Sequence, residues 1–386
     1  MSELDLKRNI KLLLVYQIFG SMMFLGPVFI LFLQEKFSLS EAILLQSIFT
    51  VSTGIFEVPA GVFADRFGKK LSLLIAEALG VVVITLYAVA TEFWQYVVLE
   101  VLIGFSLSLT SGTVSAYLYD TLLSLSLEDN FKKIWGNMLS KAMLSGAFAG
   151  VMGGFLATFS YELTFYATSA TAAIAFVVAL FLKEPKIKKE EGKKSLIKEA
   201  SIKLLKIKEV RDMVTLSTLI FIANQVLFNI YQPYWKLSGI DLAWFGVIFA
   251  SFQVVSGYGS KFAHKFERVF GLKKGLWVLM LIVLASIFLL GNIVAIYSFA
   301  FIYLQQFVRG IRPILIEDFI HKKVDSKERT TAMSLISLVN KIAYFPAILM
   351  LSMLTKSYEL VVVINIIGAT FAILALMLWF MSKRRV

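Results

Sequence analysis

The chain has no cysteine and only two histidines in its 386 residues. The missing cysteines exclude disulfide bonds, thiolate nucleophiles and cysteine-ligated metal sites. Both histidines, His264 and His321, stand in charged segments, so a histidine metal site is not expected either. The sequence also lacks a G-x4-G-K-[ST] phosphate loop and an H-E-x-x-H zinc motif. We therefore expect neither an enzyme nor a bound cofactor or metal.

Charged residues are also scarce, at 17% of the chain against about 25% in an average soluble domain. Hydrophobic residues make up 58%, and the mean hydropathy is +0.79. The apolar residues occur in blocks of about twenty, the length at which a helix crosses the hydrocarbon layer of a membrane. This pattern predicts twelve membrane spans, at roughly 10–33, 40–62, 71–90, 94–118, 135–158, 162–182, 212–235, 241–262, 274–292, 295–319, 331–355 and 358–380.

The net charge of +12 is distributed unevenly over this pattern. If the N-terminus is cytoplasmic, the outer loops carry only Lys36, Lys236 and Lys356, and most other positive charges fall on the inner side. Inner loops of membrane proteins are rich in lysine and arginine. We therefore expect a multi-pass protein of the cell membrane with both termini in the cytoplasm. The same distribution explains the positive charge without a nucleic-acid partner.

A long basic connection over residues 183–211 divides the spans into six and six. Its second half, SLIKEASIKLLKIKEV, places leucines and isoleucines among lysines at near-helical spacing, which predicts an amphipathic helix on the inner membrane surface. The predicted organisation is an N-terminal six-helix bundle over 1–182, a cytoplasmic basic linker over 183–211 and a C-terminal six-helix bundle over 212–386.

The two halves repeat each other. The segment GVFADRF at 61–67 aligns with SKFAHKF at 260–266, and Gly112 and Asp120 align with Gly310 and Asp318 at nearly the same offset. In the predicted topology the aligned segments cross the membrane in the same direction. The repeat is therefore parallel, which predicts a pseudo-twofold axis normal to the membrane.

The segment GVFADRFGKK at 61–70 lies between the second and third spans. Together with the six-plus-six repeat, it resembles the G-x-x-x-D-R-x-G-[RK]-[RK] motif of the major facilitator superfamily. The resemblance covers the whole chain. It implies an all-α integral membrane fold, with twelve transmembrane helices in two six-helix bundles.

The family resemblance also implies a latch on the cytoplasmic side, which we define as Gly61, Asp65, Arg66, Gly68, Lys69 and Asp120. Its glycines would permit a sharp turn and a close approach to a neighbour. Asp65 would lie at the N-terminal end of the eleventh helix, near Thr330, and a charge relay would run from Asp65 through Lys69 to Asp120. Lys69 stands where arginine is usual, so the charge is retained but a bidentate contact is lost. The alternative is a plain positively charged turn.

Span five resembles, in part, the G-x8-G-x3-G-P-x2-G-G pattern of exporters in this superfamily. Glycines stand at Gly136, Gly153 and Gly154, small residues at Ser145 and Ala149, and Gly150 replaces the proline. Ordinary packing of small residues between helices is an equally good explanation. Further segments, such as EVPAG at 57–61 and RTTAMS at 329–334, resemble bacterial and archaeal drug or small-molecule exporters. Many of these relatives carry arginine where this chain has Glu100.

Ionisable groups at membrane depth are functional candidates because their burial is costly. The family resemblance implies a central cavity lined by spans one, four, seven and ten. The candidate residues for substrate and proton binding are Glu100, Arg309, Lys341, Gln17, Asn224, Asn229 and Gln305. A structural salt bridge of Glu100 with a buried cation such as Arg309 is the alternative. We expect Arg312 to extend to the inner surface, and Glu57, Glu77 and Lys141 to form a structural network joined to the latch.

These features predict a secondary active transporter that moves a small molecule by alternating access, by proton-coupled efflux as an antiporter. Uptake or exchange of an organic anion, held by Arg309 and Lys341, is an alternative, and a non-transporting receptor or scaffold is a third. The expected partners are a small-molecule substrate, protons and the lipid bilayer, and the expected state is a monomer.

Overall fold

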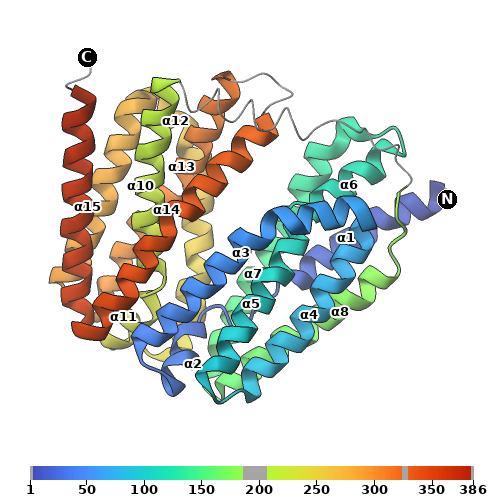
Figure 1. Ribbon diagram of the computed structural model, residues 1–386, viewed down its shortest axis with the longest axis horizontal. Helices are drawn as coiled ribbons and strands as arrows, with labels where there is room; N and C mark the ends of the chain where they lie inside the picture. Colours follow the sequence, from blue (N-terminus) through green and yellow to red (C-terminus); the bar gives the residue numbers. More distant parts are fainter. Residues whose placement is uncertain (1–2, 186–206, 324–328, 384–386) are drawn as a thin grey trace. The chain divides into compact units, whose positions relative to one another are not determined.

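The computed structural model describes residues 3–185, 207–323 and 329–383, and every regular element in these ranges is a helix (Figure 1). The first half contains α1 (Glu3–Gly20), α2 (Phe29–Lys36), α3 (Leu39–Phe67), α4 (Lys69–Val89), α5 (Phe93–Thr110), α6 (Thr113–Leu123), η1 (Glu128–Asn130), α7 (Phe131–Ala157) and α8 (Tyr161–Leu180). The second half contains α10 (Lys208–Phe228), α11 (Tyr231–Leu237), α12 (Leu242–Asn292), η2 (Ile296–Phe301), α13 (Ile302–Lys323), α14 (Arg329–Ser357) and α15 (Leu360–Lys383). The amphipathic helix predicted in the linker lies mostly outside the described residues.

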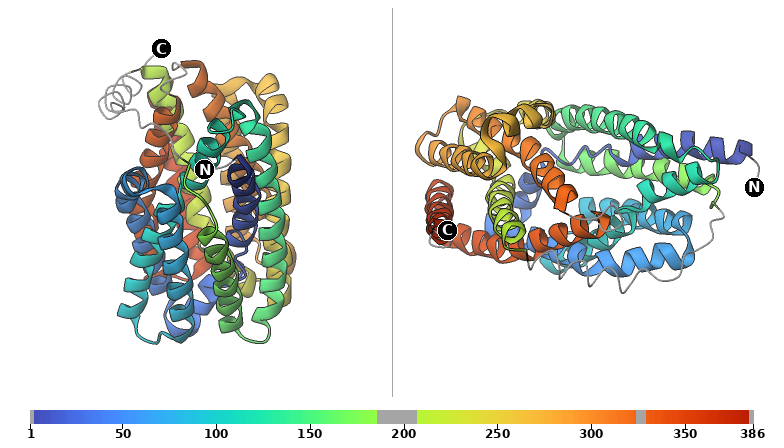
Figure 2. Two further views of the ribbon diagram at one scale, coloured as in Figure 1. Left: turned by 90° about the vertical axis from the view of Figure 1, so that its right-hand side faces the viewer. Right: turned by 90° about the horizontal axis from the view of Figure 1, so that it is seen from above.

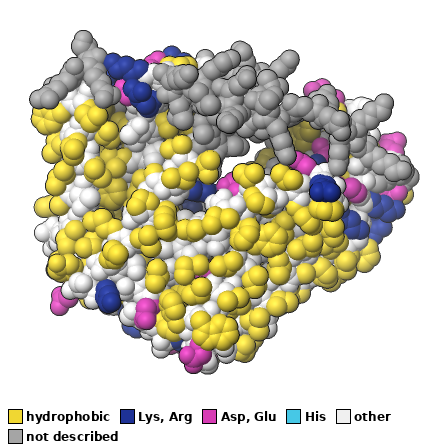
Figure 3. Space-filling view, viewed as in Figure 1, with side chains coloured by type: hydrophobic (Ala, Val, Ile, Leu, Met, Phe, Trp, Pro, Cys, Tyr) yellow, Lys and Arg dark blue, Asp and Glu magenta, His cyan; other side chains and the backbone are white. Residues whose placement is uncertain are grey.

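Within the described residues, nine helices are long and apolar enough to cross a membrane. One of them, α12, covers two of the predicted spans. The predicted first and tenth spans fall outside this set: the first is divided between α1 and α2, and the tenth carries Arg309 and Arg312. Hydrophobic side chains cover most of the face shown in Figure 3, as expected for helices that meet lipid. The chain is an all-helical membrane protein.

The chain divides into two compact units. Unit 1 is made of residues within Met1–Phe37, Leu44–Lys189 and Asp241–Ala250, and unit 2 of residues within Ser38–Ile43, Glu190–Ile240 and Ser251–Val386. In unit 1, α4 packs against α8 and α5, and α1 packs against α8, α7 and α6 (Figure 2). In unit 2, α10 packs against α14, α13 and α15.

Three of the predicted spans are interrupted rather than continuous. The first is non-helical over residues 21–28, the fourth breaks at Ser111 and Gly112, and the seventh breaks at Asn229 and Ile230. Conversely, most of the loop predicted at 263–273 is helical. The backbone at Gly271 is not, with φ +66° and ψ 173°, and it separates the two helices that α12 comprises. The sequence therefore located the spans but not their interruptions.

The break in the first span leaves backbone groups that need hydrogen-bond partners, since the hydrocarbon layer offers none. Threonines of α8 supply them. The Thr168 hydroxyl accepts hydrogen bonds from the backbone N–H groups of Phe24 and Leu25, at 3.0 and 3.3 Å. The Thr171 hydroxyl donates to the carbonyl of Met22, at 3.1 Å. Polar residues inside the apolar span α8 thus stabilise the break in its neighbour.

On the other side of the same break, α7 contributes Ser145, whose hydroxyl donates to the carbonyl of Ile18 at 3.0 Å. The first span is therefore bound through its backbone to two different helices of unit 1. These bonds hold the non-helical stretch between α1 and α2 in place.

Candidate functional site

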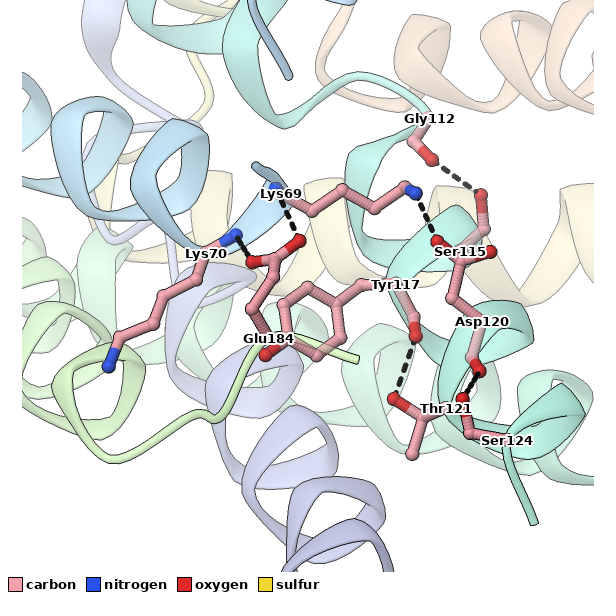
Figure 4. A network of polar contacts seen from close by, with 9 residues as sticks. All are labelled: Lys69, Lys70, Gly112, Ser115, Tyr117, Asp120, Thr121, Ser124 and Glu184. Atoms are coloured by element: carbon pink, nitrogen blue, oxygen red, sulfur yellow. Dashed lines mark hydrogen bonds and ion pairs between the residues drawn. The ribbon is translucent and has the colours of Figure 1, made fainter. Parts of the chain in front are cut away.

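The latch loop joins α3 to α4 at Gly68. Its backbone has φ +104° and ψ 147°, a conformation that residues with a side chain rarely adopt, so glycine is required here. The helix α4 begins immediately afterwards with Lys69, whose ammonium group forms an ion pair with the carboxylate of Asp120 on α6 (Figure 4). The two side chains are 18% and 22% exposed. The structure thus brings together two of the three residues of the expected charge relay, Lys69 and Asp120.

A third charged residue, Glu184, lies against the same loop and was not found by sequence reasoning. Its carboxylate accepts hydrogen bonds from the backbone N–H groups of Lys69 and Lys70, at 2.8 and 2.7 Å (Figure 4). A carboxylate at the first N–H groups of a helix is favoured by hydrogen bonding and by the helix dipole. The Lys70 ammonium group donates in turn to the carbonyl of Leu180, at the end of α8. The start of the linker is therefore attached to the latch loop.

The other latch residues lie on the last turns of α3 and are exposed. A side chain built at Gly61 would meet no atom within 4 Å, so no close neighbour among the described residues of unit 1 explains this glycine. The guanidinium of Arg66 lies 5.3 Å from the centre of the Phe67 ring. The expected partner of Asp65 is the start of the eleventh helix, which begins at Arg329 and belongs to unit 2. That contact stays a prediction.

Glu100 lies on α5 and is only 1% exposed. Gln46 of α3 donates a hydrogen bond to its carboxylate at 3.3 Å, and the buried hydroxyl of Tyr87, from α4, lies next to the same group. No lysine or arginine in the described part of unit 1 forms an ion pair with it. The surroundings of this carboxyl group are therefore polar but uncharged.

A second buried carboxyl group in unit 1 belongs to Glu77 on α4. It accepts a hydrogen bond of 2.5 Å from the hydroxyl of Tyr16 on α1. The expected network of Glu57, Glu77 and Lys141 with the latch does not include Glu77, which contacts α1 instead. Lys141 is exposed on α7.

The glycines at the end of span five pack against backbone. A side chain at Gly153 would overlap the carbonyl group of Phe24, in the break of the first span. A side chain at Gly154 would lie 2.6 Å from the backbone nitrogen of Gly246, on the part of α12 that belongs to unit 1. Gly150 meets the same segment more loosely. These contacts favour the explanation by close helix packing.

The remaining small residues of this pattern behave differently. A side chain at Gly136 would meet nothing within 4 Å, whereas Ala149 is fully buried. Close packing accounts for Gly153 and Gly154 without an antiporter function. The functional meaning of the exporter pattern in span five stays a prediction.

In unit 2, buried polar side chains gather around the break in the seventh span. The amide of Gln305, on α13, is central to them. Its oxygen accepts a hydrogen bond from the Tyr231 hydroxyl at 2.6 Å, and its nitrogen donates to the Ser286 hydroxyl at 2.9 Å. The Asn224 side chain donates to the backbone carbonyl of Gln305 at 3.0 Å. These bonds join α10, α11, α12 and α13.

Asn229 stands in the break itself. Its amide donates to the hydroxyl of Tyr344, on α14, at 2.7 Å, and to the carbonyl of Gln225, one turn earlier, at 2.9 Å. Three of the expected cavity residues, Asn224, Asn229 and Gln305, are thus engaged in hydrogen bonds within unit 2. Their first role is to form hydrogen bonds that hold the interrupted helix in position.

Arg309 lies one turn after Gln305 on α13 and is exposed. Its guanidinium donates a hydrogen bond to the side-chain oxygen of Gln306 at 3.3 Å and lies 5.7 Å from the centre of the Phe228 ring. In the described part of unit 2 no carboxylate forms an ion pair with it. Sequence reasoning selected the neighbouring Gln305 and missed Gln306, because the sequence does not show which glutamine lies beside the guanidinium.

Arg312 does not extend to the surface as expected. Its guanidinium donates to the hydroxyl of Ser217, on α10, at 3.0 Å and lies 5.1 Å from the centre of the Phe221 ring. Because α10 packs against α13, the Arg312 guanidinium finds its partners within unit 2. This arginine therefore links two helices.

The candidate substrate and proton residues fall in both units. Gln17, half-buried on α1, and Glu100 belong to unit 1, and Arg309 and the half-buried Lys341 of α14 belong to unit 2. The alternative, a pairing of Glu100 with Arg309, stays a prediction.

The chain is similar to several curated proteins over part of its length. It is 32% identical over 179 residues to the multidrug resistance protein MdtG of Escherichia coli, a match that covers 45% of this chain and 42% of that protein. It is 27% identical over 154 residues to an uncharacterized MFS-type transporter of Methanocaldococcus jannaschii, covering 40% and 38%. The matched segments thus span less than half the length of these relatives.

The fold is similar to solved structures over nearly the whole chain. A crystal structure of the nucleoside transporter NupG aligns with a TM-score of 0.81 at 15% identity, covering 97% of this chain and 99% of that one. A D-xylose-proton symporter aligns with a TM-score of 0.70 at 15% identity, covering 98% of each. Residues 12–348 match the Major Facilitator Superfamily. With its sequence motif, its helices and this match in agreement, the chain belongs to the Major Facilitator Superfamily, a family of transporters rather than enzymes.

Proposed function

We propose that this chain exports a small molecule across the cytoplasmic membrane by proton antiport, and that Glu100 carries the proton. The observation that carries the proposal is the environment of this residue: a carboxyl group on a membrane-spanning helix, 1% exposed, with Gln46 as its hydrogen-bond donor and no cation paired with it among the described residues of unit 1.

A carboxylate without a cation is costly to bury in a membrane protein, so such a group gains a partner or a proton when it leaves water. The uncharged surroundings of Glu100 leave the proton as the simplest partner. Alternating access would expose the group to the two sides of the membrane in turn, and a proton taken up on one side would leave on the other.

Export is supported by the partial similarity to a protein named for multidrug resistance. The latch supports a conformational cycle, because the Lys69–Asp120 ion pair and the hydrogen bonds to Glu184 fix the loop that follows Asp65. We propose that Asp65 closes the cytoplasmic side by binding the first turn of α14, and that release of this contact opens it.

The test uses purified protein in proteoliposomes with an imposed pH gradient and a panel of acidic, neutral and cationic fluorescent compounds. For any compound that the wild type moves, Glu100→Gln should abolish pH-driven transport and preserve downhill exchange. Glutamine retains the acceptor for Gln46, so the melting temperature should change little. Glu77→Gln is the matched control, a second buried carboxyl group that should leave coupling intact.

Wild-type proton coupling in Glu100→Gln would exclude this residue as the carrier. A large loss of thermal stability in the same variant would instead identify Glu100 as half of a structural ion pair. Removing one partner of a buried ion pair lowers the free energy of unfolding by about 3–5 kcal/mol. In that case Glu100→Gln combined with Arg309→Gln should restore the melting temperature.

A further inference from the structure

The two buried carboxyl groups and the two guanidinium groups described above belong to different units. In unit 1, the buried carboxyl groups of Glu77 and Glu100 contact tyrosine and glutamine. In unit 2, the guanidinium groups of Arg309 and Arg312 contact glutamine, serine and phenylalanine rings. Proton binding and anion binding would accordingly fall to different units.

The two arginines of unit 2 differ in what their guanidinium groups contact. Arg312 is bonded to Ser217 on a neighbouring helix and lies against Phe221, so its role is structural. Arg309 is exposed, and in the described part of unit 2 it donates a hydrogen bond to Gln306 alone. A guanidinium carries five N–H donors. Most donors of Arg309 are therefore available to a ligand.

Gln306 supplies a second donor beside Arg309. Its side chain is fully buried and its oxygen accepts the bond from Arg309. Its amide nitrogen makes no hydrogen bond among the described residues, although the Tyr231 hydroxyl lies near the side chain. The reverse amide orientation would set the NH2 group against the guanidinium, so the bond to Arg309 fixes the orientation. A buried donor without a partner costs free energy that a ligand can recover.

Aromatic rings form the adjoining wall. The Phe228 ring lies under the Arg309 guanidinium, and Tyr231 packs edge-on against Phe228 with ring centres 5.7 Å apart. The Tyr231 hydroxyl is fixed by its bond to Gln305. A cation and a donor next to a positioned aromatic surface suit a ligand that combines a negative charge with a flat apolar ring.

We propose that Arg309 binds the carboxylate of an aromatic monocarboxylic acid, and that this is the substrate class of the exporter. The inference rests on the proposed function, since it takes the site to be one for transported molecules. A planar carboxylate matches the guanidinium through two parallel hydrogen bonds. One guanidinium balances one negative charge, which favours a carboxylate over a doubly charged phosphate. Gln306 acts as a positioning residue.

The test compares three ligands of one shape: 2-naphthoate, 2-naphthamide and 2-naphthylmethylammonium. Titration calorimetry on the purified full-length protein should find the acid binding at least about tenfold tighter than the amide. Arg309→Gln should remove this preference, and Arg309→Lys should retain part of it.

Gln306→Glu gives a sharper version of the same test. It places a carboxylate of nearly identical shape beside Arg309, where it occupies the guanidinium and repels the ligand. The preference for 2-naphthoate should disappear, and the melting temperature should match or exceed that of the wild type. Gln306→Leu removes the donor without adding a charge and should weaken acid binding only a few-fold.

Equal affinity of the wild type for acid and amide would overturn the inference, as would an undiminished preference in Gln306→Glu. Tighter binding of the ammonium compound would assign a cationic substrate instead. These outcomes are separate from the proposed function: pH-driven transport that depends on Glu100 can be found for neutral or cationic compounds while the inference fails. Conversely, 2-naphthoate can bind through Arg309 even if no compound is moved, in which case proton-coupled export fails.

Discussion

Gly153 and Gly136 both stand on α7, yet only one of them is close to other atoms. Gly153 is buried against the carbonyl group of Phe24, while Gly136 is exposed with open space around it. A comparison of the two positions therefore shows whether a glycine on α7 is needed for close packing or only tolerated there.

We expect Gly153→Ala to lower the free energy of unfolding by about 1–3 kcal/mol, because the added methyl group forces α7 away from the first span. Gly136→Ala should be neutral or stabilise by up to about 1 kcal/mol, since alanine is the better helix former. Thermal unfolding in detergent, followed by circular dichroism, compares the two. Equal melting temperatures in both variants would contradict the close contact.

Single residues of the site were predicted from the sequence where a charge, a motif or a polar side chain on a cavity-lining span marked them. The Lys69–Asp120 contact followed from the family resemblance. Glu184 and Gln306 were missed because their importance depends on the backbone N–H groups and the guanidinium that the fold places beside them. Arg312 was misjudged because distance to the membrane surface was considered and distance to α10 was not.

At the scale of elements, hydropathy predicted the spans, since length and apolar content are properties of the segment itself. It could not predict the breaks. Gly26 and Pro27 in the first span indicate irregular backbone, but the groups that satisfy this backbone, such as those of Thr168 and Ser145, belong to α8 and α7. A break that depends on partners in other helices is not visible in one segment.

Because the break depends on α8, we expect a substitution of Thr168 to lower the free energy of unfolding. Thr168→Val keeps the shape of the side chain and removes the acceptor for the N–H groups of Phe24 and Leu25. Leaving buried donors without a partner should cost about 1–3 kcal/mol. The control is Thr158→Val at the exposed end of α7, where the hydroxyl bonds only to Phe155 of its own helix and the effect should stay within about 0.5 kcal/mol. Matching melting temperatures for the two variants would show that the break does not need α8.

At the scale of the whole molecule, the latch should bias the equilibrium between conformations. We expect Asp65→Asn to shift the population toward the inward-open state by no more than the free energy of the lost contact, about 1–3 kcal/mol for a charge-assisted hydrogen bond. Distances between spin labels at Ser126 and Lys273, on the predicted inner loops of the two units, measure the shift. Arg66→Gln changes the charge of the same loop and should leave the distances unaltered. Unchanged distances in Asp65→Asn would remove the latch from the mechanism.

Orientation in the membrane is the property of the whole chain that its charge distribution predicts most directly. The absence of cysteine allows single cysteines to be introduced without a background signal. Glu92, Lys236 and Ser357 are exposed positions at the predicted outer ends of helices, and Ser126 and Lys273 are exposed positions in predicted inner loops. An impermeant maleimide added to intact cells should label cysteines at the first three positions and label the other two only after the membrane is made permeable.

The opposite labelling would reverse the orientation, and it would transfer the latch and Asp120 to the outer side. Labelling of Ser126→Cys together with Glu92→Cys in intact cells would contradict the membrane crossing by α5 and α6 that lies between them.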